Sequence, residues 1–183
     1  MTKLFFKYGT VNSGKSTQLL VNDHQYYSTH VDRTTILIKS SICDRNGIRS
    51  RVGLQKDANY IISPNDRIPV DEIIKSGASC IFVDEVQFLS SRHIHELADI
   101  SLTIPVLCYG LRTTWKGELF DSISTLMAIA DKIEEIKTIC YMCDRKATQN
   151  LKVGGNSNIV ETDSTAVYYP VCRACFKRGE WVE

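Results

Sequence analysis

A glycine-containing segment near the N-terminus holds the first residues that could do chemistry. Residues 9–16 read GTVNSGKS and fit the pattern G-x-x-x-x-G-K-[ST]. In such a loop, successive backbone N–H groups point at one anion, the lysine reaches the terminal phosphates and the final hydroxyl ligates Mg²⁺. The sequence therefore predicts that ATP or a similar triphosphate binds on Gly9, Thr10, Val11, Asn12, Ser13, Gly14, Lys15 and Ser16.

Two adjacent acids follow an apolar run near the middle of the chain. Residues 81–83 read IFV and precede Asp84 and Glu85. A phosphate loop needs a carboxylate from a neighbouring strand to hold Mg²⁺, so we expect Asp84 to share the ion with Ser16. Glu85 is expected to face the phosphate acceptor as a general base, where it takes a proton from an attacking hydroxyl or water.

The seven cysteines fall into two groups. Cys43, Cys80 and Cys108 are scattered, and we expect them to behave as small apolar side chains. The others form two C-x-x-C pairs separated by 28 residues. Two matched pairs are typical of a tetrahedral zinc site, although a thioredoxin-like redox motif shares the C-x-x-C spacing. We predict structural Zn²⁺ on Cys140, Cys143, Cys172 and Cys175.

Apolar runs alternate with helical segments over residues 1–137. We expect a mobile loop over 40–67 that ends in a short strand, and a strongly periodic helix over 121–136. The alternation predicts an α/β fold with a mostly parallel, P-loop NTPase-type sheet flanked by helices. The expected strands are residues 4–6, 34–39, 60–62, 80–83 and 105–110. The other expected helices are residues 15–27, 70–75 and 91–99.

The character of the sequence changes after Lys137 to short, polar hairpins that carry the paired cysteines. We therefore expect two domains. Residues 1–137 would form the nucleotide-binding domain, and residues 138–183 a small C-terminal zinc-binding domain whose fold depends on the metal.

Composition and charge exclude several classes of protein. Of the 183 residues 43% are hydrophobic and 23% charged, as in an average globular protein. No apolar run approaches the roughly 18 residues that cross a bilayer, and the N-terminus does not resemble a secretory signal. A formal net charge of +1 disfavours a nucleic acid polymer or a membrane as partner. We expect a cytoplasmic protein.

Two functions fit these residues. One is a small-molecule phosphotransferase, and the other is an ATPase that acts on nucleic acid and binds it through the zinc domain. Residues 138–183 carry six basic and five acidic side chains, and a segment with such a balanced charge should bind a polyanion weakly. The phosphotransferase is therefore favoured. Trp115 and Phe120 follow the strand at 105–110, where they could stack on a base or cover the core.

Four segments resemble the cellular and bacterial type of thymidine kinase, over nearly the whole chain. They are YGTVNSGKST at 8–17, DEVQFL at 84–89, CYGLRTTWKGELF at 108–120 and the late C-x-x-C pairs. The resemblance implies a homotetrameric salvage enzyme that uses Mg²⁺ and ATP to phosphorylate the 5′-hydroxyl of thymidine, and of deoxyuridine. It also implies dTTP as a feedback ligand.

The resemblance also assigns roles to individual residues. Glu85 matches the family's proton acceptor, and the segment Asp84, Glu85, Val86 and Gln87 matches its second nucleotide-contacting stretch. The positions that enclose the base in the family correspond to Phe88, Leu111, Trp115, Phe120 and Tyr168.

Two further features of the resemblance concern loops. Arg45 follows Asp44 like the Asp/Arg pair of the family, which makes it the candidate for neutralising the transferring phosphate, with Arg51 as the alternative. The loop between the cysteine pairs resembles the family's lasso over the nucleoside. Many members carry an apolar-Gly-Gly triplet where this chain has Thr162-Asp163-Ser164, so the backbone contacts to the base are expected to differ.

Overall fold

The computed structural model describes residues 3–30, 32–42, 47–160 and 166–179, and its centre is a six-stranded sheet. The strand order is β5-β2-β6-β7-β1-β8, and every neighbouring pair is parallel. This confirms the predicted mostly parallel sheet. The strands are β1 Leu4–Tyr8, β2 Thr35–Ser40, β5 Tyr60–Ile62, β6 Cys80–Asp84, β7 Val106–Gly110 and β8 Lys132–Glu135.

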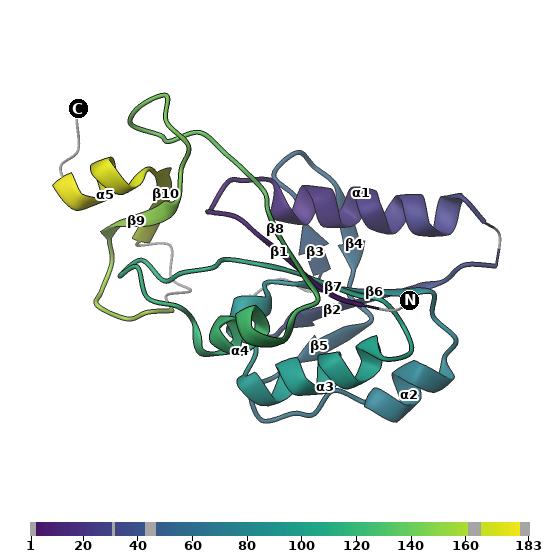
Figure 1. Ribbon diagram of the computed structural model, residues 1–183. Helices are drawn as coiled ribbons and strands as arrows, with labels where there is room; N and C mark the ends of the chain where they lie inside the picture. The colour runs from purple at the N-terminus through teal and green to yellow at the C-terminus, as the bar shows by residue number, and fades with distance from the viewer. Residues whose placement is uncertain (1–2, 31, 43–46, 161–165, 180–183) are drawn as a thin grey trace.

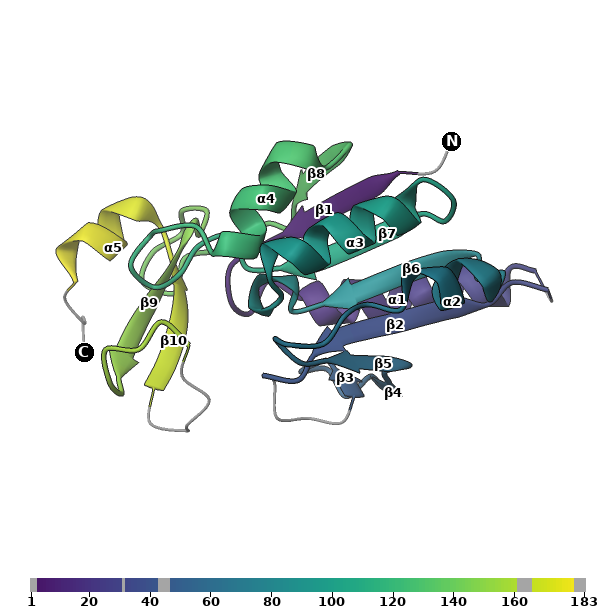
Figure 2. The same ribbon diagram turned by 90° about the horizontal axis from the view of Figure 1, so that it is seen from below.

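Helices cover both faces of the sheet (Figures 1 and 2). One face carries α1, Lys15–Ser28, and the other carries α2, Val70–Lys75, α3, Ser91–Ser101, and α4, Asp121–Ile129. Every residue of the central strands β6 and β7 is buried. A strand covered on both faces must be apolar throughout, and this explains the continuous runs IFV and VLC in the sequence.

The parallel arrangement brings three functional segments to one edge of the sheet. Strands β6, β7 and β1 are consecutive neighbours, so their carboxyl ends lie together. The phosphate loop follows β1, Asp84 ends β6, and Leu111 follows β7. Ligands of open α/β sheets bind at this edge.

The cysteine unit is a two-stranded antiparallel hairpin with a short helix beside it. It consists of β9, Gln149–Gly154, β10, Ala166–Val171, and α5, Arg173–Arg178. Figure 1 shows it beside the phosphate-loop end of the sheet. The predicted hairpin is confirmed. The sequence did not indicate α5, which has only six residues and whose N-cap is Cys172.

The predicted helix over 121–136 is wrong beyond Ile129. Ala130 leaves the helix with extended backbone (φ −66°, ψ 133°), and residues 132–135 form β8 on the free edge of β1. The Asp131 carboxylate accepts the Leu4 N–H at 2.7 Å where this pairing begins. Strand pairing satisfies backbone groups of β1 that a longer helix would leave unpaired.

The expected mobile loop over 40–67 also contains more structure than the sequence indicated. β3, Gly47–Arg49, and β4, Gln55–Asp57, form an antiparallel hairpin against α1. Ile48 is fully buried in the layer between α1 and the sheet. Lys56 pairs with Asp23 of α1 at 2.7 Å. One buried isoleucine in a polar stretch gives no periodic signal, and the hairpin was missed for that reason.

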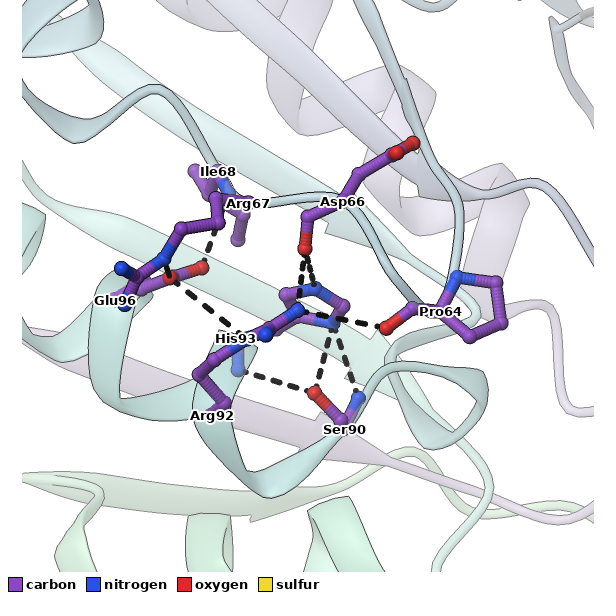
Figure 3. Close-up of polar contacts among 8 residues, drawn as sticks. All are labelled: Pro64, Asp66, Arg67, Ile68, Ser90, Arg92, His93 and Glu96. Atoms are coloured by element: carbon purple, nitrogen blue, oxygen red, sulfur yellow. Dashed lines mark hydrogen bonds and ion pairs between the residues drawn. The ribbon is translucent and has the colours of Figure 1, made fainter.

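A polar network fixes the start of α3 (Figure 3). Ser90 caps the helix by accepting the His93 N–H, and the His93 ring accepts the Ser90 N–H in return at 3.2 Å. The other ring nitrogen of His93 contacts the Asp66 carbonyl at 2.9 Å, and Glu96 accepts the Ile68 N–H at 3.0 Å. The segment before α2 is therefore tied to α3.

Candidate active site

A cavity of about 500 Å³ opens beside the phosphate loop. Its lining contains the start of α1, the two acids at the end of β6, and residues of the β3–β4 hairpin. Cationic side chains from three different elements reach it. Its lining includes Val11, Asn12, Gly14, Lys15, Ser16, Lys39, Arg49, Arg51, Asp84 and Glu85.

The phosphate loop has the backbone that the sequence pattern requires. Asn12 and Gly14 adopt left-handed backbone conformations, with φ of 62° and 83°. A Cβ at Gly9 would lie 2.3 Å from Ser13 Oγ and 2.7 Å from the Ile136 carbonyl, so no larger residue fits there without displacement. The 14-residue helix α1 begins directly after the loop, at the cavity, and its N-terminus favours an anion.

Lys15 is buried at the base of this cavity. Its ammonium group donates to the Thr10 carbonyl at 2.7 Å. Burial lowers the pKa of Lys15, while the carboxylates of Glu85 and Asp84 act in the opposite direction. The charge of Arg51 also reaches Lys15 and lowers its pKa further. A poorly solvated ammonium beside a guanidinium makes this region well suited to a polyphosphate.

Ser16 and Asp84 form the candidate magnesium site. The Ser16 hydroxyl donates to the two Asp84 carboxylate oxygens at 3.0 and 3.3 Å. Adjacent oxygen ligands around octahedral Mg²⁺ lie about 3 Å apart, so these residues fit the ion. Burial, reinforced by the neighbouring Glu85 carboxylate, raises the pKa of Asp84. A cation in this position would compensate for the buried negative charge.

Glu85 is held in place by the turn that follows β6. Its backbone is left-handed (φ 50°), and its carboxylate accepts from Gln87 Nε2 at 2.5 Å. The Gln87 oxygen in turn accepts the Leu111 N–H at 3.0 Å. Gly110 makes room for this amide, because a Cβ there would lie 2.6 Å from the Gln87 oxygen. The position of the Glu85 carboxylate thus depends on Gln87 and on Gly110 at the end of β7.

A second cavity, of about 170 Å³, adjoins the first. Glu85, Val11 and Leu111 line both cavities. The walls of the second cavity are mainly aromatic and aliphatic, with a few polar groups, as is usual for small-molecule sites. All five residues expected to enclose a base line it: Phe88, Leu111, Trp115, Phe120 and Tyr168.

The aromatic side chains of the second cavity come from separate segments. Phe88 and Phe120 meet edge to face, with ring centroids 6.1 Å apart. Trp115 donates its indole N–H to the Asn158 carbonyl at 3.0 Å, and it also lines the cavity. Trp115 and Phe120 thus border this cavity, and stacking of either side chain on a base stays a prediction.

The four paired cysteines lie close together in the cysteine unit. Their sulfur atoms all lie within 4.8 Å of one another, and Cys143 Sγ is 3.7 Å from Cys172 Sγ and 3.8 Å from Cys175 Sγ. Thiolates bound tetrahedrally to Zn²⁺ at 2.3 Å lie about 3.8 Å apart, so the cluster fits this metal. The Cys175 N–H lowers the pKa of the Cys172 thiol to about 6, which favours the thiolate. Cys80 and Cys108 are buried and apart from the cluster, as expected.

Comparisons with known proteins agree with this geometry. A family model described as thymidine kinase matches residues 2–176. The chain belongs to the thymidine kinase family. Among its relatives is a thymidine kinase of Lactiplantibacillus plantarum, 37% identical over 183 residues and 94% of each chain. One from Listeria monocytogenes is 39% identical over 186 residues, and one from Haemophilus influenzae is 38% identical over 190 residues; the matches cover 96% and 97% of each chain.

Solved structures add little to this family assignment. A crystal structure of Pif1 helicase from Candida albicans aligns with a TM-score of 0.44 and 14% identity, over 75% of this chain and 36% of that chain. A likeness this weak supports no functional statement. In the part of the chain that the structure describes, no helix is long and apolar enough to cross a membrane.

Some residues that the phosphate-loop pattern or the family resemblance assigned to the nucleotide site lie elsewhere. Val86 is fully buried in the core, and Gln87 lines the second cavity, not the first. Gly9 and Thr10 border a small separate space behind the loop. Arg45 and the triplet at 162–164 lie outside the described residues. Arg51, the alternative to Arg45, lines the phosphate cavity.

Several site residues escaped sequence reasoning. Lys39 lies near the carboxyl end of β2, next to β6, and it lines the phosphate cavity. Its position near the end of an apolar strand is the same signal that pointed to Asp84, so it could have been found. Asn150 lines the second cavity from β9. Nothing in the sequence around it indicates this placement.

Proposed function

We propose that this chain transfers the γ-phosphate of ATP to the 5′-hydroxyl of thymidine, giving ADP and dTMP, and that it also accepts deoxyuridine. The observation that carries the proposal is the position of Glu85, which lines both the phosphate cavity and the adjoining aromatic cavity. Family membership supports the choice of acceptor, and the phosphate loop supports the choice of donor.

The donor binds in the larger cavity. The loop amides, the N-terminus of α1 and Lys15 hold the phosphates, and Ser16 and Asp84 hold Mg²⁺. The ion, when bound, neutralises charge on the β- and γ-phosphates. Arg51 is the described arginine that we assign to the transferring phosphoryl group, because it lines the cavity and its charge reaches Lys15. Arg51 thus has the role for which the family resemblance made Arg45 the first candidate.

The acceptor binds in the smaller cavity, with its base against Phe88, Trp115 and Phe120. Its 5′-hydroxyl then faces Glu85, which takes the proton as the oxygen attacks phosphorus. The new O–P bond forms as the bond from phosphorus to the ADP oxygen breaks, with the two oxygens in line. Gln87 keeps the Glu85 carboxylate in position, and correct placement supplies much of the rate.

The remaining assignments extend this proposal to the whole molecule. Residues 1–137 form the nucleotide-binding domain, and residues 138–183 form a zinc-binding domain that covers the nucleoside. Structural Zn²⁺ binds the four clustered cysteines, whose sulfur spacing supports it. The enzyme acts in cytoplasmic deoxynucleotide salvage as a homotetramer, with dTTP as a feedback ligand and no nucleic acid or membrane partner.

Product analysis tests the function directly. Purified protein with thymidine, ATP and Mg²⁺ should form dTMP and ADP in equal amounts, and EDTA should stop the reaction because the phosphates lose their counter-ion. Separation of the nucleotides by ion-exchange chromatography measures both products. ADP formed without dTMP would contradict the proposal.

A further inference from the structure

Asn150 connects the cysteine unit to two loops of the nucleotide-binding domain. It lies on β9 and is 3% exposed. Its side-chain oxygen accepts the Val11 N–H of the phosphate loop at 2.9 Å. Its amide nitrogen donates to the Thr113 carbonyl, in the loop after β7, at 3.2 Å. One buried side chain thus bonds backbone groups that are 139 and 37 residues away in the sequence.

The bond to Val11 fixes a peptide group that Lys15 also uses. Val11 N–H and Thr10 C=O belong to the same peptide unit, and the Thr10 carbonyl accepts the Lys15 ammonium at 2.7 Å. Because a trans peptide is planar, its N–H and C=O point in opposite directions and turn together. Asn150 therefore holds one side of this plane while Lys15 contacts the other.

The phosphate loop has few other bonds that could hold this peptide. Among the described residues, the backbone hydrogen bond inside the loop that involves this peptide runs from the Ser13 N–H to the Thr10 carbonyl, at a long 3.4 Å. Gly14 has little intrinsic preference for one backbone conformation, and the left-handed backbone of Asn12 is one that residues other than glycine rarely adopt unaided. A buried bond from outside the loop is then the stronger constraint.

We infer that Asn150 is a positioning residue through which the cysteine unit sets the conformation of the phosphate loop, and hence its affinity for a nucleoside triphosphate. The inference rests on the proposed function only in taking this loop as the triphosphate site. An asparagine suits the task because its short side chain carries both an acceptor and donors. Leucine, of similar size, has neither, so it would leave the Val11 N–H and the Thr113 carbonyl unpaired.

Nucleotide titration of two variants tests the inference. Asn150→Ala and Asn150→Leu should each bind the magnesium complex of the non-hydrolysable ATP analogue AMP-PNP about tenfold more weakly than the unchanged protein. In kinetic assays, KM for ATP should rise by a similar factor, while kcat changes by less than about threefold. Asn59→Ala is the matched control, because the Asn59 side chain also accepts a distant backbone N–H, that of Leu37, at 2.8 Å. It should bind the analogue normally.

Zinc content and thermal unfolding, measured on the same samples, separate positioning from loss of fold. A folded variant that retains zinc and binds AMP-PNP within twofold of the unchanged protein would overturn the inference. If neither variant folds, amide hydrogen exchange of Val11 in the unchanged protein decides, because rapid exchange would mean that the Asn150 bond is absent. AMP-PNP binding does not require phosphoryl transfer. Weakened binding in a chain that forms no dTMP would therefore refute the proposed function and leave the role of Asn150 standing.

Discussion

At the scale of single residues, the site depends on two acids, Asp84 and Glu85, that are adjacent in the sequence but have different surroundings. Asp84 ends β6 in a buried position and contacts Ser16, whereas Glu85 turns out of the strand with left-handed backbone. A residue other than glycine rarely adopts this conformation, and strain of this kind is found at functional sites. The Gln87 amide then orients the Glu85 carboxylate between the two cavities.

Replacing Glu85 by glutamine should separate binding from chemistry. The amide has nearly the same shape but cannot accept the proton, so thymidine phosphorylation should slow by about 10²–10⁴-fold. Binding of Mg·AMP-PNP and of thymidine should remain within about threefold of the unchanged protein. Steady-state kinetics and calorimetric titration measure the two effects. Glu72→Gln, on α2 and away from both cavities, is the control, and near-normal turnover of Glu85→Gln would remove Glu85 from its role.

At the scale of elements, helix α3 depends on a buried acid that the site does not use. Glu96 accepts the Ile68 N–H and pairs with Arg67 at 2.9 Å (Figure 3). Partial burial opposes its ionisation, but the Ile68 N–H and the Arg67 guanidinium outweigh this effect and lower the pKa of Glu96. A carboxyl with a lowered pKa stabilises the fold above its unfolded pKa of about 4.3, and this stabilisation is lost as the pH falls below that value.

Glu96→Gln should therefore destabilise the protein in a pH-dependent way. We expect a loss of about 1 kcal/mol in the free energy of unfolding at pH 7, because the charged acceptor is gone. The difference from the unchanged protein should shrink as the pH falls below the unfolded pKa of about 4.3 and through the lowered pKa of the native glutamate, which then becomes neutral as well. Urea unfolding at a series of pH values measures it, with the exposed Asp99→Asn on the same helix as control. An equal loss at pH 7 and pH 3.5 would contradict the ionic contribution.

The elements that the sequence predicted share strong local signals. Buried strands such as β6 contain a continuous apolar run, and α2 begins and ends where its composition indicated. The errors have a common cause, which is tertiary pairing without a local signal. Residues 132–135 continue the periodicity of a helix but join the free edge of β1. The β3–β4 hairpin depends on one buried isoleucine, and α5 on a sulfur cap at Cys172.

At the scale of the whole molecule, the two cavities share part of their lining, and each also has residues from a different part of the chain. The phosphate cavity is formed mainly by the sheet edge and the β3–β4 hairpin. Asn150 of β9, Tyr168 of β10, and Ile159 and Val160 help to enclose the aromatic cavity. A contiguous motif predicted the phosphate-loop residues of the first cavity, but Lys39 and Arg49 were not predicted. The sequence could not predict that Asn150 of the cysteine unit contacts the phosphate loop, because no motif joins them.

Loss of zinc should therefore affect both substrates. Cys172→Ser removes a ligand at the centre of the cysteine cluster, and we expect loss of bound zinc, unfolding of residues 138–183 and loss of thymidine binding. Affinity for Mg·AMP-PNP should fall as well, by about tenfold, because Asn150 no longer reaches the loop. Metal analysis, circular dichroism and titration measure these changes. Cys108→Ala, at a buried cysteine in β7, is the control, and a zinc-free variant that stays folded and active would contradict a structural metal.

The most direct test of thymidine kinase activity is ADP release with Mg·ATP across a set of acceptors. The set contains thymidine, deoxyuridine, deoxycytidine, the purine deoxynucleosides, single-stranded DNA and water alone. We predict turnover with thymidine and deoxyuridine only, as the proposed function requires. Stimulation by DNA with none by nucleosides would contradict the proposed function and indicate a nucleic-acid-dependent ATPase.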